Sequence, residues 1–207
     1  MPEHSARVVV FIDYMNLFND ARAAFFAFPF GPSDGQMSPM RLGRLLCGRQ
    51  PLGTSTPRSC VGVRVYRGRP DPRKEPKTYS AHMRQCAAWE AEGATVATRP
   101  LRYPRDWPDR REEEKGIDVQ IAIDMVMMAI NGELDVAILA STDTDQRPVL
   151  EAFHTLPLDP KPIVEIATWR SPTFNKKLEV KGLHVWQNFL EEADFKAIRD
   201  GRDYNQP

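Results

Sequence analysis

Acidic side chains occur at three separated places where folding could bring them together. Asp13 ends the apolar run VVVFI, and Asp118 stands near the start of a long apolar stretch. Asp143 and Asp145 follow a further apolar run, VAILA. Carboxylates that converge repel one another unless a cation lies among them. Mg²⁺ prefers such oxygen ligands, and a cluster of this kind suits metal-assisted phosphodiester hydrolysis, in which the ion activates a water and offsets charge on the leaving oxygen.

Each aspartate also has a purely structural interpretation. Asp13 could cap the helix that follows it, while Asp143 and Asp145 could form a turn and a helix N-cap. Asp118 could be a favourable charge in the first turn of a helix. Asp124 lies six residues after Asp118 and so on another helix face, which favours a structural role or plain exposure for it. The joint pattern favours a metal site over four unrelated roles.

Apolar runs and helix signals predict strands and helices that alternate along the whole chain. Strands are expected at 7–13, 61–67, 94–100, 134–141 and 163–168. Helices are expected at 14–26, 39–47, 78–92, 115–130, 146–155 and 184–192. This alternation predicts a mainly parallel sheet with helices on both faces. Open sheets of this class place functional residues at the carboxyl ends of their strands, where Asp13 and 142–145 are expected.

Length and composition limit the class of protein. The 207 residues predict a single domain over 1–207, with a core at about 7–192 and a flexible C-terminal tail. No apolar run approaches the roughly 20 residues of a membrane helix, and the N-terminus lacks a secretory signal. Three widely spaced cysteines argue against a disulfide framework and a cysteine-ligated zinc site. A cytoplasmic location is therefore expected, and a homodimer is left open.

The zero net charge hides a strong asymmetry along the chain. Residues 41–111 carry sixteen Lys/Arg against six Asp/Glu, whereas 112–207 carry ten against eighteen. The basic segments 67–77 and 99–111 also include Tyr103 and Trp107. Arginine beside aromatic rings suits single-stranded nucleic acid, through phosphate pairing and base stacking. Two solvated loops are the alternative interpretation.

Three motifs in order, FIDYMN, KGIDVQIAIDM and ILASTDTD, resemble the signatures of the NYN-domain family over about 7–170. That family includes the LabA-like proteins and belongs to the PIN-like nuclease superfamily. The resemblance implies a Rossmann-like, three-layer α/β/α domain with an aspartate-ringed Mg²⁺ or Mn²⁺ site that cleaves RNA. It assigns the direct ligand positions to Asp13, Asp118, Asp143 and Asp145, with Asp124 as a possible further one, and gives Asn16 the role of orienting the site.

The sequence departs from the family pattern around these aspartates. Thr142 stands where the family has glycine, Gln146 replaces a packing aromatic, and Tyr14 replaces the glycine that usually follows the first aspartate. All the carboxylates are present, so the departures concern the shape of the substrate cleft. The candidate substrate contacts are Asn16, Lys115, Ser141, Thr142, Arg67 and Arg102.

These observations favour a metal-dependent endoribonuclease that hydrolyses single-stranded or structured RNA with an activated water. The alternative is a non-catalytic RNA- or protein-binding module on a degenerate nuclease fold, which Thr142 and Gln146 motivate. A haloacid-dehalogenase-type phosphatase is disfavoured because Met15 stands where that chemistry requires a second aspartate. No nucleophilic triad, phosphate-binding loop or dinucleotide fingerprint is present.

Overall fold

A computed structural model describes residues 5–51 and 53–206. The ends of the expected domain, 1–4 and 207, lie outside the described residues, as does residue 52. The elements are β1 (Ala6–Asp13), α1 (Tyr14–Phe25), α2 (Pro39–Cys47), β2 (Arg58–Arg69), α3 (Pro76–Ala91), β3 (Thr95–Pro100), α4 (Ile117–Ile130), β4 (Val136–Ala140), the 3-10 turn η1 (Thr144–Gln146), α5 (Arg147–Thr155), β5 (Ile163–Trp169), β6 (Trp186–Leu190) and α6 (Glu192–Ile198). Among the described residues, none of the helices has the length and apolar character needed to cross a bilayer.

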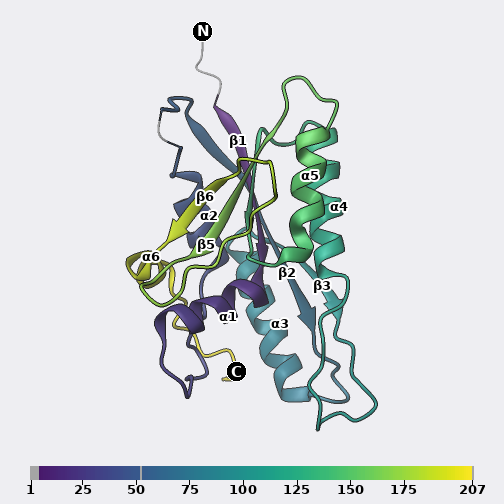
Figure 1. Ribbon diagram of the computed structural model, residues 1–207. Helices are drawn as coiled ribbons and strands as arrows, with labels where there is room; N and C mark the ends of the chain where they lie inside the picture. Colours follow the sequence, from purple (N-terminus) through teal and green to yellow (C-terminus); the bar gives the residue numbers. More distant parts are fainter. Residues whose placement is uncertain (1–4, 52, 207) are drawn as a thin grey trace.

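The six strands form one sheet, in the order β3-β2-β1-β4-β5-β6, and all five pairings are parallel (Figure 1). Side chains of β1 alternate between two cores, as the two-residue period of a strand requires. Val8, Val10 and Ile12 pack with residues of α1, α2, α3 and α6. Val9 and Phe11 pack with residues of α4 and α5 on the other face. The predicted three-layer α/β fold is confirmed.

The strand order places a switch point next to β1. The chain runs outward from β1 to β2 and β3, then returns through α4 to place β4 on the other side of β1. Connections therefore diverge at the carboxyl ends of β1 and β4, where open α/β sheets bind ligands. Asp13 ends β1, and residues 141–143 follow β4.

The prediction of a helix at 184–192 is wrong. Trp186–Leu190 forms the edge strand β6, which pairs in parallel with β5, and the helix begins only at Glu192. Trp186 and Phe189 favour strand over helix. A capping box marks the start of this helix. The Glu191 side chain accepts the backbone N–H of Asp194, and the Asp194 side chain accepts the backbone N–H of Glu191.

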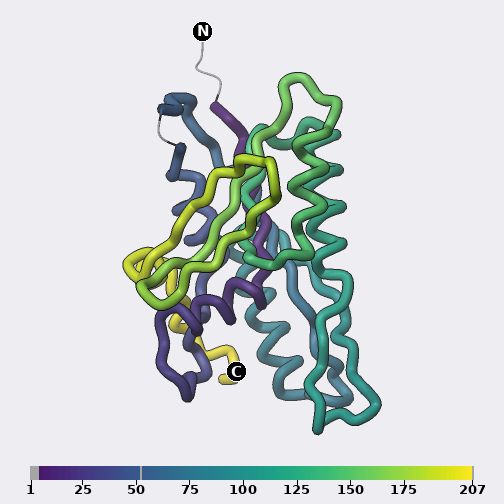
Figure 2. The backbone as a smooth tube through the Cα atoms, in the orientation of Figure 1, coloured from purple at the N-terminus to yellow at the C-terminus, as the bar shows by residue number. Residues whose placement is uncertain are grey.

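The two basic segments predicted from the sequence contact each other beyond the end of the sheet. The Tyr103 hydroxyl donates to Glu75 Oε2 at 2.5 Å and accepts from the backbone N–H of Asp71 at 2.9 Å. Lys74 Nζ lies 4.3 Å from the centre of the Tyr103 ring. Figure 2 shows the connection from β3 to α4 extending past the sheet beside α3. Cations and aromatic rings thus gather on one projection of the molecule.

Residues 201–206, expected to form a loose tail, make several contacts. The Gln36 side chain donates to the carbonyls of Asp200 and Arg202, at 3.1 and 2.8 Å. The Tyr204 hydroxyl donates to Asp200 Oδ2 at 2.7 Å, and Arg84 Nε donates to the Tyr204 carbonyl at 2.8 Å. These bonds connect the C-terminal segment to α3 and to the connection between α1 and α2.

A buried ion pair joins β2 to β5 and provides a test of the fold. The Glu165 side chain is 0% exposed, and it accepts from Arg58 Nη2 at 2.5 Å and from Asn188 Nδ2 at 3.0 Å. Arg58→Met would leave a buried carboxylate without its cation, so we expect the free energy of unfolding to fall by about 3 kcal/mol. Urea unfolding monitored by circular dichroism measures it, with the exposed Arg105→Met as the control. A loss as small as the control's would show that the ion pair does not stabilise the fold.

Candidate metal centre

Three carboxylates from separate segments converge at the switch point of the sheet. Asp13 comes from the end of β1, Asp118 from the first turn of α4, and Asp143 from the connection between β4 and η1. One carboxylate oxygen from each lies within 4.8 Å of the others. The fold therefore brings Asp13 next to two residues that are more than a hundred positions away from it in the sequence.

Hydrogen bonds fix the Asp13 carboxylate on both of its oxygens. Asp13 Oδ1 accepts the backbone N–H of Asn16 at 3.3 Å, which also makes Asp13 the N-cap of α1. Asp13 Oδ2 accepts the Ser141 hydroxyl at 3.2 Å. Ser141 Oγ in turn accepts the backbone N–H of Asp143 at 3.1 Å. The capping role considered for Asp13 and a place in the acidic cluster are thus compatible, and Ser141 links the Asp13 carboxylate to the backbone of Asp143.

The Asp118 carboxylate is bound by Gln146, one of the residues that depart from the family pattern. Gly116, with φ of +75°, turns the chain into α4, and Asp118 follows in the first turn. Gln146, which is 1% exposed, donates its side-chain amide to Asp118 Oδ1 at 3.3 Å. A phenylalanine side chain has no donor and could not make that bond. Gln146 therefore has a polar function at the site, and its presence does not by itself indicate a degenerate cluster.

Thr142, the second departure, also makes specific contacts. Its backbone N–H donates to Asn16 Oδ1 at 2.9 Å, and its hydroxyl donates to Asp20 Oδ2 at 2.5 Å. Asp20 is buried and also binds Lys176 Nζ at 2.8 Å. None of the described residues other than glycine has a positive φ, so the turn after β4 does not require glycine at position 142. Asn16 and Asp20 of α1 together hold the segment that carries Asp143.

Burial and mutual repulsion both disfavour negative charge at this site. Asp13 is 3% exposed, and its burial, assisted by the charges of Glu114 and Asp118, raises its pKa to about 7. Burial also raises the pKa of Asp118, with further contributions from the charges of Asp143 and Asp145. A divalent cation would offset this repulsion and allow the carboxylates to ionise together.

Glu114 is a further acidic residue of this region that the sequence interpretation missed. Its Oε1 accepts the backbone N–H of Gly68 in β2. Burial raises the pKa of Glu114, the nearby Arg67 charge lowers it, and the charge of Asp118 raises it. The only sequence signal is the run Glu112–Glu114 just before Gly116. A run of three glutamates does not reveal which one is directed inward.

Two aspartates of the predicted set lie outside the three-residue cluster in the part of the chain that the structure describes. Asp145 is exposed, and its backbone N–H donates to Asp143 Oδ1 at 2.9 Å, so Asp143 is the N-cap of η1. Asp124 accepts from the Tyr66 hydroxyl at 2.8 Å, from Arg64 at 3.1 Å and from the Gln120 amide at 2.8 Å. These partners give Asp124 the structural role that the sequence favoured for it.

The basic residues proposed as substrate contacts are scattered. Lys115 is exposed and forms an ion pair with Glu113 at 3.7 Å. Arg102 is exposed and forms a backbone bridge with Glu113. Arg67 is directed to the opposite face of the sheet, where its guanidinium carbon lies 5.2 Å from the Tyr14 ring centre and 5.5 Å from that of Trp89. Asn16, Ser141 and Thr142, in contrast, are bonded around the acidic cluster.

The donor set of the cluster fits a hard divalent cation. All three side chains offer carboxylate oxygens, and neither histidine nor cysteine belongs to the group. Oxygen-only sites of this type suit Mg²⁺, Mn²⁺ and Ca²⁺ better than softer metals. Three ligands also leave coordination positions for water and for phosphate oxygens.

Comparisons with known proteins agree with this architecture. A family model described as NYN domain matches residues 7–156, which span Asp13, Asp118 and Asp143. Among solved structures, a crystal structure of a Vibrio parahaemolyticus protein of unknown function is similar, with a TM-score of 0.54 and 16% identity. The similarity covers 93% of this chain and 96% of that one, and at this identity it concerns the fold alone. A search of curated proteins finds no match.

Proposed function

The chain belongs to the NYN-domain family, and from that premise we propose that it is a metal-dependent endoribonuclease with Asp13, Asp118 and Asp143 as its ion ligands. The observation that carries the proposal is the convergence of three carboxylates, from three segments, within 4.8 Å at the switch point. Mg²⁺ or Mn²⁺ is the proposed ion, because the donors are all hard oxygens.

The ion, when bound, would activate a water for attack on a phosphodiester and offset the charge on the leaving oxygen. The protein's own residues set the geometry for that reaction. Asn16 and Ser141 fix the orientation of Asp13, and Gln146 fixes that of Asp118. Such supporting hydrogen bonds usually hold metal ligands in their productive orientation. No covalent enzyme intermediate is required.

Glu114 is suited to receive the proton of the attacking water. Its Oε1 is occupied by the Gly68 N–H, and we assign the proton to Oε2. Its burial and the charge of Asp118 raise its pKa, so it holds a proton more readily than an ordinary glutamate. Asp145 would act through its negative charge, which reaches Asp118.

RNA is the proposed substrate. Support comes from the projection formed by segments 67–77 and 99–111, where Lys74 lies over Tyr103 and 5.3 Å from the ring centre of Trp107. Cations beside aromatic rings bind single strands through phosphates and stacked bases. Lys115, at the start of α4, would extend this basic region toward the acidic cluster.

The direct test is cleavage of an end-labelled single-stranded RNA by purified protein. We expect cleavage with Mn²⁺ or Mg²⁺, and none in EDTA. Asp143→Asn should reduce the rate at least about 100-fold, because a direct ligand should matter at least as much as an outer partner. Asp159→Asn is the matched control. This exposed aspartate precedes the amino end of β5, whereas the cluster lies at the carboxyl ends of the strands. Absence of metal-dependent cleavage would leave a binding module as the function of the domain.

A further inference from the structure

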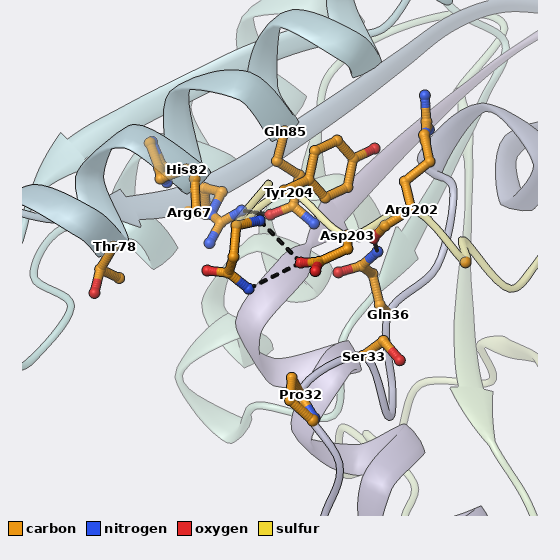
Figure 3. Close-up of a pocket in the computed structure, with 13 residues that line it drawn as sticks. Pro32, Ser33, Gln36, Arg67, Thr78, His82, Gln85, Arg202, Asp203 and Tyr204 are labelled. Carbon is orange, nitrogen blue, oxygen red and sulfur yellow. Dashed lines mark hydrogen bonds between the residues drawn. The ribbon is translucent and has the colours of Figure 1, made fainter. Parts of the chain in front are cut away.

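A second site lies on the other face of the sheet from α4. An open cavity of about 360 Å³ lies between β2, α3, the connection between α1 and α2, and the C-terminal segment 201–205 (Figure 3). That volume is within the range of small-ligand sites. Arg67, Gln85 and His82 line it from β2 and α3, and Gln36 and Tyr204 line it from the other two segments.

The walls of this cavity are held in place by hydrogen bonds. Gln36 binds two carbonyls of the C-terminal segment, and Tyr204 is bound to Asp200 and to Arg84. Gln85 Nε2 donates to the Tyr14 hydroxyl at 3.4 Å, and Arg67 donates to Gln85 Oε1. The C-terminal segment thus forms one wall of the open cavity.

Two residues that line the cavity each carry a buried side-chain nitrogen without a hydrogen-bond partner among the described residues. These nitrogens are His82 Nδ1 and Arg67 Nε. His82 is 3% exposed, and burial, followed by the charges of Arg67 and Arg69, lowers its pKa to about 3, so its ring is neutral at physiological pH. The other ring nitrogen, Nε2, lies 3.5 Å from Cys86 Sγ. Buried polar atoms without partners are costly, so the fold alone does not satisfy these two residues.

The cavity lining has one cation without an ion pair. Within the described chain, Arg67 forms no ion pair, whereas Arg202 is paired with Asp200 and Glu92, both at 2.8 Å. The rest of the polar lining includes the amides and hydroxyls of Gln36, Gln85, Asn205, Ser33 and Thr78, and the Asp203 carboxylate, which accepts from the backbone and side-chain N–H groups of Asn205. One guanidinium for a phosphate, with amides and a carboxylate that can accept the amino group of a base, complements a nucleotide better than a bare anion.

The cavity and the acidic cluster share the same end of β1 and β2. Tyr66 is in register with Asp13, so Arg67 is the next residue along β2 and is directed to the opposite face. Tyr14 follows Asp13 directly, and its ring lies under the Arg67 guanidinium. The Arg67 charge also acts on Glu114. A single strand that crosses this edge of the sheet could therefore contact both sites.

We propose that the cavity bounded by Arg67, His82 and Gln85 binds one unstacked nucleotide of the RNA strand and so sets a nucleotide preference next to the cleaved phosphate. This inference rests on the proposed nuclease function. Sequence-specific RNA recognition commonly places a splayed base in such a pocket. The base would bond the amides and the Asp203 carboxylate, and Arg67 would meet the adjoining phosphate.

The first test measures nucleotide binding without catalysis. Asp13→Asn protein in EDTA is titrated by NMR with the four 5′-mononucleotides and with inorganic phosphate. We expect at least one nucleotide to bind at least about tenfold more tightly than phosphate. Thr78→Trp, which fills the cavity from an exposed position on α3, should weaken that binding at least tenfold. Ser80→Trp, exposed on the same helix and outside the lining, is the control.

Several results would overturn the proposal. They are no nucleotide binding, equal affinity for phosphate, or equal effects of the two tryptophan variants. If Thr78→Trp fails to fold, Asn205→Trp replaces it, with Gln206→Trp as its control, since Asn205 lines the cavity and Gln206 does not.

A second test separates this proposal from the nuclease function. Cut sites of the wild type and of Thr78→Trp are mapped on a random-sequence RNA. We expect a base preference at one fixed position near the cut, and its loss in Thr78→Trp while cleavage continues. Cleavage with the same base profile in both proteins would refute the cavity proposal and leave the nuclease intact. Nucleotide binding without any cleavage would refute the nuclease and leave the cavity as a nucleotide site.

Discussion

Asp13→Asn should reduce metal-dependent RNA cleavage at least about 1000-fold, whereas Asp145→Asn should cost about tenfold or less. The sequence alone gave these two aspartates the same role. In the structure Asp13 is a member of the three-carboxylate cluster and is almost fully buried, while Asp145 is exposed and affects Asp118 through its charge. Single-turnover cleavage of an end-labelled RNA at saturating Mn²⁺ measures both losses.

This contrast requires that both variants remain folded. Asparagine keeps the shape of Asp13, and its carbonyl can still accept the backbone N–H of Asn16. The near-ultraviolet circular dichroism of both variants should therefore match the wild type. Equal losses in Asp13→Asn and Asp145→Asn would mean that the ion is centred between the two, and the three-ligand assignment would be wrong.

The architecture was largely predictable because its signals are local. Buried parallel strands form apolar runs such as VVVFI, and proline and glycine mark where helices begin and end. β6 was missed because WQNFL has neither a long apolar run nor clear alternation, and its strand conformation depends on pairing with β5. Pairing at a sheet edge is a tertiary property, which a single segment does not reveal.

The site was predictable only in part, for a related reason. Strand ends locate Asp13 and Asp143, because the carboxyl ends of parallel strands meet at one edge of the sheet. The bond from Gln146 to Asp118 joins side chains from η1 and α4, so no local pattern announces it. The face of the sheet to which Arg67 is directed depends on the register of β2 beside β1. Because Tyr66 is paired with Asp13, Arg67 is directed away from the acidic cluster.

Burial of Asp13 makes the stability of the metal-free protein depend on pH. An aspartate in an unfolded chain has a pKa near 3.9. In the folded protein burial raises the pKa of Asp13 to about 7, and the charges of Glu114 and Asp118 contribute to the increase. The folded state therefore binds a proton that the unfolded state has already released between about pH 4 and pH 7. Its stability without metal must fall as pH rises through that window.

Asp13→Asn should consequently stabilise the protein in EDTA at alkaline pH. Near pH 4 the two proteins should be similarly stable, because Asp13 is protonated in the folded wild type. At pH 8 the variant should have a free energy of unfolding higher by up to about 4 kcal/mol, the equivalent of a shift of about three pKa units. Urea unfolding of both proteins at several pH values measures the difference, with Asp159→Asn as the control.

Mn²⁺ should reverse the order of stability at pH 8, because a ligand that binds only the folded state stabilises it. The wild type should then gain stability in proportion to the logarithm of the Mn²⁺ concentration, and Asp13→Asn should gain far less. A pH-independent difference in EDTA would show that Asp13 is ionised in the folded protein without a cation. An equal response of both proteins to Mn²⁺ would place the ion elsewhere, and the cluster of Asp13, Asp118 and Asp143 would need another explanation.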